Sequence, residues 1–367
     1  MTTPLLELRD VRVGFPTEDG LVQAVDKVSY SVEPGKTLAV VGESGSGKSV
    51  TSLAIMGLHN RKRTVVEGQI MLDGDDLLQL EADEVRALRG RKMAMIFQDP
   101  LSSLHPYFRI GDQLVEAVLV HQKVSKQAAH ARSLELLQRV GIPNARARMD
   151  TYPHQMSGGM RQRVMIAMAL VNDPELLIAD EPTTALDVTV QAQIIELLKD
   201  IQNERGTAIV IITHDLGVVA DVADEVVVMY GGRVVERGTV EDIYYRPAMP
   251  YSWGLLGSVA RMDGDRGQRL RPIKGQPPSL INLPQGCVFR PRCDFHQYVE
   301  GNRCDVERPD LYPEGRGHYA RCFLSHEQKV TLRLEALAGT PADEQVSAAD
   351  GRVARGATAV TTTEAAQ

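Results

Sequence analysis

The chain has 367 residues, of which 43% are hydrophobic and 24% are charged, and its formal net charge is −7. This composition predicts a globular protein with room for more than one domain, and the acidic balance argues against a nucleic-acid partner, which requires a basic surface. The sequence has no apolar run of about 18 residues, and its first residues lack the basic and apolar regions of a secretory signal, so we expect a cytoplasmic protein with no membrane span.

Two strand-like segments open the chain, at residues 5–13 and 22–33. Phe15 is predicted to lie in the loop between them. An aromatic side chain upstream of a phosphate-binding loop can stack on an adenine base, and it can equally be a hydrophobic plug. The spacing favours neither interpretation over the other.

A phosphate-binding loop is predicted between a buried strand at 38–41 and a helix at 50–58. Its residues are Gly42, Glu43, Ser44, Gly45, Ser46, Gly47, Lys48 and Ser49, followed by Val50, and they match G-x-x-x-x-G-K-[ST]. Glycines let backbone N–H groups wrap a phosphate, and the helix N-terminus adds partial positive charge. Lys48 would contact the β- and γ-phosphates, and the Ser49 hydroxyl would bind Mg²⁺. The alternative is a plain glycine-rich turn, which the Lys-Ser pair disfavours.

Further short strands are predicted at 68–73 and 92–97, and Gln98 follows the second of them. A glutamine at this position can reach a metal ion or a water molecule, although a solvated loop glutamine is common. From about 101 to 153 the strand pattern stops. Helical spacing at 109–121 and 126–140 predicts a helical insertion in an otherwise α/β chain.

Four polar positions or segments follow the insertion. Ser157, Gly158, Gly159 and Met160 open a helix, where they could bind an anion or simply cap the helix. Asp180 and Glu181 end a buried strand, where Asp180 can hold Mg²⁺ and Glu181 can act as a general base. Asp187 precedes a helix at 188–203, and His214 ends a strand at 208–213. Because parallel strands end at one edge of a sheet, His214 is expected to face the phosphate-binding loop.

The last third of the chain begins with a hairpin at 224–230 and 233–237 and a helical stretch at 238–260. Residues 262–285 are rich in Gly, Pro and Arg and predict a linker. Four cysteines follow with the spacing C-x5-C-x10-C-x17-C, at Cys287, Cys293, Cys304 and Cys322. In a reducing compartment such a group is more typical of a metal site than of disulfides. The segment from about 331 onward predicts a disordered tail, with a helical turn or two at 331–338.

The ordered set of motifs resembles the nucleotide-binding subunit of ATP-binding-cassette (ABC) transporters. The resemblance covers about residues 1–240, with Phe15 in the place of the adenine-stacking aromatic. It implies that Gln98 and Asp180 contact Mg²⁺ and water, that Glu181 is the general base, and that His214 is the switch histidine. Asp187 would belong to the D-loop, and Ser157 to Met160 would contact ATP held by an opposite subunit. The segment reads Met-Ser-Gly-Gly-Met where the family usually has Leu-Ser-Gly-Gly-Gln, which leaves the serine and both glycines in place.

Residues 98–104 and 274–325 narrow the resemblance to the ATPases of oligopeptide, dipeptide and nickel importers. This likeness implies a [4Fe–4S] cluster on the four cysteines, with Zn²⁺ or four reduced, buried thiols as alternatives. It divides the chain into a nucleotide-binding domain at 1–260, with its helical subdomain at about 101–156, a cysteine-containing extension at 261–330 and a tail at 331–367. The implied fold is α/β: a P-loop NTPase (RecA-like) core with an antiparallel β subdomain, an inserted helical subdomain and a small C-terminal lobe.

The implied function is ATP hydrolysis, with ATP and Mg²⁺, that powers peptide import. Alternatives are an ATPase for another solute such as nickel chelates, an exporter cassette or a soluble ABC ATPase unconnected with transport. The implied partners are two membrane-spanning subunits, a second cassette (a paralogue, or a copy of this chain) and an extracytoplasmic substrate-binding protein, with no nucleic acid. The chain would then lie peripherally on the cytoplasmic face of the membrane.

Overall fold

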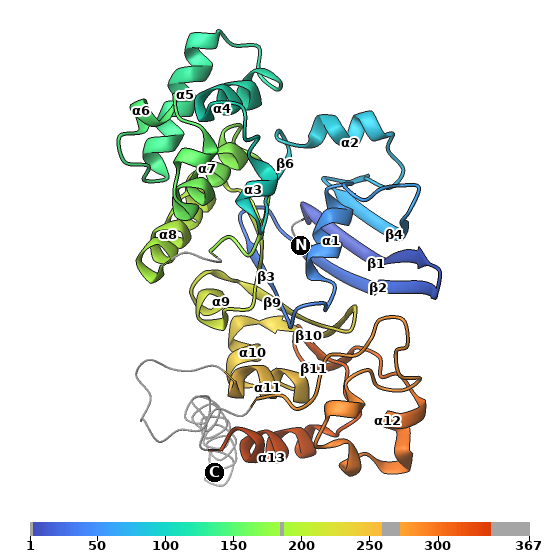
Figure 1. Ribbon diagram of the computed structural model, residues 1–367. Coiled ribbons are helices and arrows are strands. Elements are labelled where there is room, and N and C mark those ends of the chain that lie inside the picture. Colours follow the sequence, from blue (N-terminus) through green and yellow to red (C-terminus); the bar gives the residue numbers. More distant parts are fainter. Residues whose placement is uncertain (1–2, 184–186, 259–271, 339–367) are drawn as a thin grey trace, which may run out of the picture. The chain divides into compact units, whose positions relative to one another are not determined.

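The computed structural model describes residues 3–183, 187–258 and 272–338 (Figure 1). The chain forms two compact units. The first unit comprises Met1–Pro16, Val25–Val40 and Lys48–Ala223, and the second comprises Thr17–Ala24, Val41–Gly47 and Asp224–Gln367. This division differs from the predicted boundary at residue 260, which stays a prediction.

A parallel sheet forms the centre of the first unit. Its strand order is β3-β8-β7-β6, with bounds Thr37–Val41, Ala208–Thr213, Leu176–Asp180 and Met93–Ile96. Leu176 lies opposite both Met93 of β6 and Ala208 of β8, and every residue of these four strands is buried. Continuous apolar runs such as Leu-Leu-Ile-Ala are what a sheet covered on both faces requires. The register brings the carboxyl ends of β6, β7 and β8 to one edge, as predicted.

A second sheet in this unit is antiparallel, with the order β2-β1-β4-β5. Its strands span Gly20–Val32, Leu6–Thr17, Val65–Leu72 and Asp75–Asp76. The predicted loop position of Phe15 is wrong, because β1 continues through it. Val13 and Gly14 still pair with Val66 and Val65 of β4, so the strand does not end at residue 13. These two sheets, together with the helices of the same unit, confirm the predicted α/β fold of the P-loop class.

A group of helices follows β6 (Figure 1). It consists of α3 (Pro100–Ser103), α4 (Ile110–Leu119), α5 (Lys126–Arg139), α6 (Ala145–Arg148), the 3-10 helix η1 (Pro153–Gln155) and α7 (Gly158–Leu170). Val115 and Val118 of α4, Ala129 of α5 and Val171 after α7 form a buried apolar cluster. The predicted helical insertion is therefore a packed subdomain with its own core.

Four further helices complete the first unit: α1 (Lys48–Ile55), α2 (Ala82–Leu88), α8 (Val188–Arg205) and α9 (Leu216–Val222). The sequence did not indicate α2 and α9, which are only seven residues long. Both begin at acidic caps. Glu81 and Glu84 form a capping box on α2, and the Asp215 carboxylate accepts from the N–H groups of Gly217 and Val218 on α9.

The sheet of the second unit has the order β11-β12-β10-β9, with bounds Tyr312–Gly315, His318–Ala320, Arg233–Thr239 and Glu225–Tyr230. β9 and β10 form the predicted hairpin, and Glu236 of β10 pairs with Ala320 of β12. We call residues 272–338 the C-terminal lobe. The lobe also contains α12 (Arg303–Val306), α13 (His326–Leu337) and three 3-10 helices, η2 (Arg290–Arg292), η3 (His296–Tyr298) and η4 (Glu300–Asn302).

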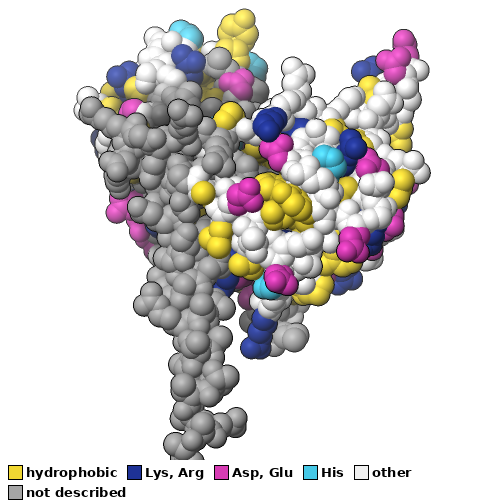
Figure 2. Space-filling model, turned by 90° about the horizontal axis from the view of Figure 1, so that it is seen from below, with side chains coloured by type: hydrophobic (Ala, Val, Ile, Leu, Met, Phe, Trp, Pro, Cys, Tyr) yellow, Lys and Arg dark blue, Asp and Glu magenta, His cyan; other side chains and the backbone are white. Residues whose placement is uncertain are grey.

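Two expectations for this unit change. The helical stretch predicted at 238–260 is two helices, α10 (Val240–Tyr245) and α11 (Pro250–Gly257), because Pro247 and Pro250 lack the N–H that a continuous helix needs. The helical turns predicted at 331–338 are the end of a longer helix, since α13 begins at His326, runs to Leu337 and buries Lys329, Leu332, Arg333 and Leu337. Residues 339–367 lie outside the described part of the chain. On the described part of the face in Figure 2, acidic and basic side chains are interspersed.

Candidate nucleotide site

Asp180, the last residue of β7, is the most deeply buried acidic group at the sheet edge, with 4% of its surface exposed. Burial raises the pKa of its carboxyl group, against the opposing effects of a hydrogen bond from Ser49 and the charge of Lys48. Its Oδ1 is buried and has no hydrogen-bond partner among the described residues. An unpaired carboxylate oxygen beside a hydroxyl is the hard oxygen donor set that Mg²⁺ prefers, so Ser49 and Asp180 fit the expected magnesium site.

The Glu181 carboxylate lies between two of the predicted catalytic residues. Gln98 Nε2 donates to Glu181 Oε2 at 3.0 Å, and His214 Nδ1 lies 3.4 Å from Glu181 Oε1. The Glu181 backbone has a φ of 48°, in the left-handed region, and its N–H donates to Ile212 O at 2.8 Å. Such strained residues cluster at functional sites. A carboxylate held between an amide and an imidazole is placed to accept a proton from water.

A buried amide secures the turn after Glu181. Gln162, in α7, is 2% exposed, and its Nε2 donates to Pro182 O at 2.8 Å. No sequence motif marked Gln162 as a site residue. The available signal was a polar side chain on the face of α7 that also carries Met165 and Ile166, which are buried.

The glycine positions of the phosphate-binding loop lie in the second unit. Gly42, Gly45 and Gly47 have φ values of 152°, 78° and 101°. A Cβ on Gly47 would lie 2.6 Å from Ala24 O, and one on Gly42 would collide with Met229 O. Space therefore excludes side chains at Gly42 and Gly47, and the positive φ disfavours one at Gly45, as a loop that wraps a phosphate requires.

The remaining loop residues differ in exposure. Ser44 and Gly45 are exposed at the tip, whereas Ser46 is buried and its carbonyl oxygen accepts from Gly232 N at 3.1 Å. In the first unit, Lys48 begins α1 and is 7% exposed. Val50 follows in the same helix, where its carbonyl oxygen lies 2.8 Å from His59 Nε2. The Phe15 ring packs edge-on against the His59 ring, with centroids 5.6 Å apart.

Ser157 caps α7 through a hydrogen bond from Met160 N at 3.3 Å. Ser157 and Gly158 are exposed, and Gly159 and Met160 are half-buried, so the start of the helix is accessible. Asp187 likewise caps α8, accepting from Val190 N at 2.9 Å. Residues 184–186, which complete the predicted D-loop segment, lie outside the described residues. The capping interpretation of Ser157 is thus confirmed, and its contact with an opposite subunit stays a prediction.

All four cysteines are free thiols in the C-terminal lobe. Burial raises the pKa of each, to about 11 for Cys304 and about 12 for Cys322, and the groups lie close enough to influence one another electrostatically. No group of three or more His, Cys, Asp or Glu side chains in the described residues has the arrangement of a metal site. The four thiols do not form such a group, so the predicted [4Fe–4S] cluster and the Zn²⁺ alternative are without structural support.

Comparisons with known proteins agree with the motif order. Residues 25–184 match the family described as ABC transporter, and residues 235–298 match the family described as oligopeptide/dipeptide transporter, C-terminal region. Among curated relatives, the oligopeptide transport ATP-binding protein of Haemophilus influenzae is 49% identical, over 89% of this chain and 98% of its own. The corresponding protein of Escherichia coli is 52% identical over 88% and 94%, and a dipeptide transport ATP-binding protein of Bacillus subtilis is 50% identical over 88% and 96%.

Solved structures of ATP-binding cassettes share the fold. A dimeric cassette bound to ADP and phosphate has a TM-score of 0.59 and 27% identity, over 64% of this chain and 98% of its own. A transporter cassette from Clostridium perfringens has a TM-score of 0.55 and 27% identity, over 66% and 91%. Of the helices described in the present chain, none has the length and apolar character needed to cross a bilayer.

Proposed function

The chain belongs to the ABC transporter family, among the ATP-binding subunits of oligopeptide and dipeptide transporters, and from this premise we propose that its ATP hydrolysis drives peptide import through separate membrane-spanning subunits. The observation that carries the proposal is the convergence of Gln98 and His214 on the Glu181 carboxylate, in a chain that also matches the C-terminal region of peptide transporters. The curated relatives, which are oligopeptide and dipeptide transport ATP-binding proteins, favour peptides over nickel chelates as the solute.

In this proposal each site residue has one task. The backbone of Gly42–Gly47 and the Lys48 ammonium bind the phosphates, with Ser44 and Val50 at the ends of the cradle and Phe15 beside the base. Ser49, Asp180 and Gln98 would hold Mg²⁺, which would neutralise charge on the phosphate oxygens. Glu181 accepts the proton of the attacking water. His214 interacts with the γ-phosphate, and its contact with Glu181 keeps both side chains at the reacting end.

A second cassette completes the site. The accessible start of α7, at Ser157 and the two following glycines, would face the γ-phosphate of ATP held by the partner, with Asp187 near the same interface. The known dimeric cassettes support this arrangement by analogy. The second cassette is a paralogue or another copy of this chain. The assembly also includes two membrane-spanning subunits and an extracytoplasmic substrate-binding protein, and it places this chain on the cytoplasmic face of the membrane.

The proposal assigns the four cysteines to packing of the C-terminal lobe as reduced thiols. A [4Fe–4S] cluster remains the alternative, because the four sulfur atoms come from one small lobe and lie within electrostatic reach of one another. The two possibilities differ in iron content and in thiol reactivity.

The test of the catalytic assignment is Glu181→Gln in the assembled transporter. Loss of the proton acceptor should lower kcat for ATP hydrolysis by about a hundred-fold or more, with ATP binding retained. Glu175→Gln is the matched control, since Glu175 is an exposed carboxylate just before the other end of β7. Equal ATPase rates for wild type and Glu181→Gln would refute the assignment.

A further inference from the structure

A buried arginine of the C-terminal lobe reaches the phosphate-binding loop within the second unit. Arg292, at the end of η2, forms a two-pronged ion pair with Glu43, the residue after the first loop glycine. Nη1 lies 2.5 Å from Oε2 and Nη2 lies 3.0 Å from Oε1. The Arg292 side chain is 5% exposed and that of Glu43 is 27% exposed. The two residues are separated by 249 positions in the sequence.

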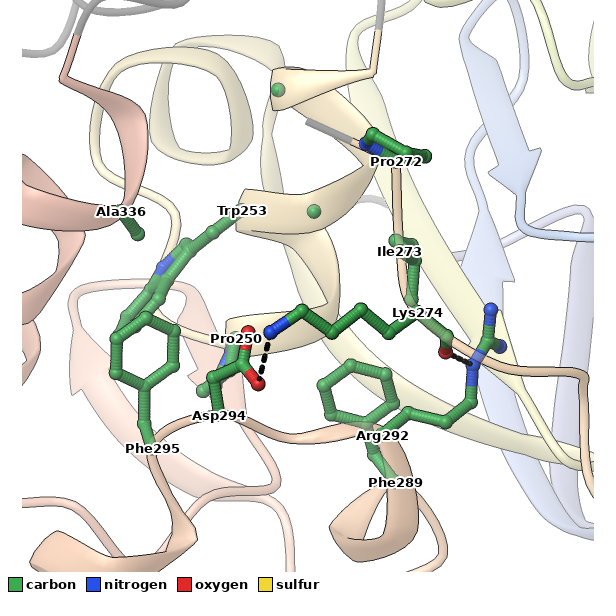
Figure 3. Close-up of a pocket in the computed structure, with 12 residues that line it drawn as sticks. Pro250, Trp253, Pro272, Ile273, Lys274, Phe289, Arg292, Asp294, Phe295 and Ala336 are labelled. Carbon is green, nitrogen blue, oxygen red and sulfur yellow. Dashed lines mark hydrogen bonds and ion pairs between the residues drawn. The ribbon is translucent and has the colours of Figure 1, made fainter. Parts of the chain in front are cut away.

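The guanidinium group is held from several sides. Its Nε donates to Lys274 O at 2.7 Å (Figure 3). Nη1 donates to Tyr230 Oη at 3.3 Å, and Nη2 donates to Gly275 O at 3.4 Å. Hydrogen bonding to Glu43 raises the pKa of Arg292 above its ordinary value. A planar fork fixed in this way presents two donors in one orientation, which lysine could not do.

Glu43 is also fixed through its backbone. Its N–H donates to Tyr251 Oη of α11 at 2.8 Å. The Tyr251 ring packs against Tyr230 and against Phe289 of the lobe, with centroid distances of 4.5 Å and 5.4 Å. The carboxylate and the backbone N–H of Glu43 therefore both form hydrogen bonds to side chains that belong to the lobe or pack against it.

A second route joins the lobe to the loop through the tip of the β9–β10 hairpin. A Cβ on Gly231 would lie 2.6 Å from Val288 of the lobe, so backbone and lobe are in close contact there. The next residue, Gly232, donates its N–H to Ser46 O of the loop at 3.1 Å. A shift of the lobe would thus displace the phosphate-binding loop at two residues, Glu43 and Ser46.

We propose that Arg292 is a positioning residue for the nucleotide, which holds Glu43 in place and neutralises its charge beside the site for the triphosphate. The C-terminal lobe then contributes to ATP binding through Arg292. This inference rests on the proposed assignment of the loop at 42–49 to ATP. An unpaired carboxylate in this loop would repel the polyphosphate, and an unfixed Glu43 would loosen the backbone that wraps it.

The experiment compares ATP binding by the full chain and its variants, with a fluorescent ATP analogue as the probe, alongside thermal unfolding of each variant. Arg292→Gln should weaken binding about ten-fold, equal to about 1.4 kcal/mol. The double variant with Glu43→Gln should bind more tightly than Arg292→Gln alone, because the unpaired charge is gone. Arg292→Lys should lie between, since it keeps the charge but loses the fork. In the assembled transporter the loss should appear in KM for ATP, with kcat little changed.

Two controls lie in the same lobe. Lys274→Gln breaks the Lys274–Asp294 ion pair, and Arg290→Lys alters the Arg290–Asp305 pair. Both should bind ATP as wild type does. If Arg292→Gln unfolds at a lower temperature, the ATP affinities of the more conservative Arg292→Lys and of the double variant are compared with wild type instead.

Wild-type affinity in a folded Arg292→Gln, or effects of Arg292→Gln and Glu43→Gln that simply add, would overturn the inference. Lys48→Ala separates this failure from a failure of the proposed site. If Lys48→Ala loses ATP binding while Arg292→Gln keeps it, only the role of Arg292 is refuted. If Lys48→Ala also keeps binding, the assignment of the loop itself is wrong.

Discussion

At the scale of single residues, the site depends on polar groups that are fixed by other polar groups. Gln162 is an example, because its amide holds the carbonyl oxygen of Pro182 directly after Glu181. A buried carbonyl that loses its donor keeps its desolvation cost, which is larger than the net gain from an average hydrogen bond. Loss of the Gln162 amide would therefore destabilise the turn that carries Glu181, the proposed general base.

Replacing Gln162 with Leu should therefore lower the free energy of unfolding by about 1 to 3 kcal/mol. It should also lower kcat, because Glu181 loses support. Denaturant unfolding and ATPase assays measure the two effects. Gln193→Leu is the control, since Gln193 is exposed on α8 and accepts a hydrogen bond from Arg163, and its cost should stay within about 0.5 kcal/mol. A Gln162→Leu protein with unchanged stability and kcat would contradict the supporting role.

The sequence predicted those site residues that follow directly from strand order. Asp180, Glu181 and His214 end or follow parallel strands, and such strands end at one sheet edge whatever their separation in the sequence. Arg292 and Gln162 could not be predicted in this way. Their partners are set by tertiary packing, and neither lies at a fixed spacing from the residue it contacts.

At the scale of elements, the caps of α7 and α8 show how one side chain can serve both folding and function. Ser157 satisfies the start of α7 within this chain, and its exposure leaves it accessible to a partner. The helical insertion and the hairpin were predictable from periodicity, because their apolar spacing repeats over many residues. The short helices α2 and α9 were not, since seven residues carry too little periodicity.

Substitution at Ser157 separates the two roles. Ser157→Ala removes the cap and should lower the free energy of unfolding by about 1 kcal/mol. Ser157→Asp keeps an oxygen acceptor and should retain nearly wild-type stability, yet its negative charge should abolish most ATPase activity if this residue faces the partner's γ-phosphate. Unfolding curves and ATPase rates of the assembled transporter measure both. Full ATPase activity in Ser157→Asp would show that Ser157 acts as a cap alone.

At the scale of the whole molecule, the cysteine spacing correctly indicated a C-terminal lobe. The predicted state of the cysteines, a metal cluster, differs from the free thiols of the structure. The predicted cluster came from the number of cysteines and from family resemblance. The structure instead surrounds the thiols with packed side chains, which favours the protonated form and raises each pKa. Burial of this kind depends on tertiary contacts, so cysteine spacing alone could not predict it.

Cys304 is buried and the other three cysteines are half-buried, and all four have raised pKa values, so the protonated thiols should react slowly with iodoacetamide in the folded protein at pH 8 and fully after unfolding. Since their folded pKa values are raised, the stability from the neutral thiols is fully present below the unfolded pKa and is lost as pH rises toward about 11 to 12. Mass spectrometry and unfolding at rising pH measure these effects. Iron and acid-labile sulfide in near-stoichiometric amounts, with visible absorption, would instead establish the cluster.

The pairing of β10 with β12 has a consequence for any shortened form of this protein. β10 lies between β9 and β12, and β12 comes from the C-terminal lobe. A chain cut after residue 258 would leave the N–H and C=O groups of β10 as an open sheet edge, which is a template for pairing with other chains. Such a fragment should aggregate even though its nucleotide-binding motifs are complete. Deletion of the lobe is thus a poor way to obtain a minimal cassette from this chain.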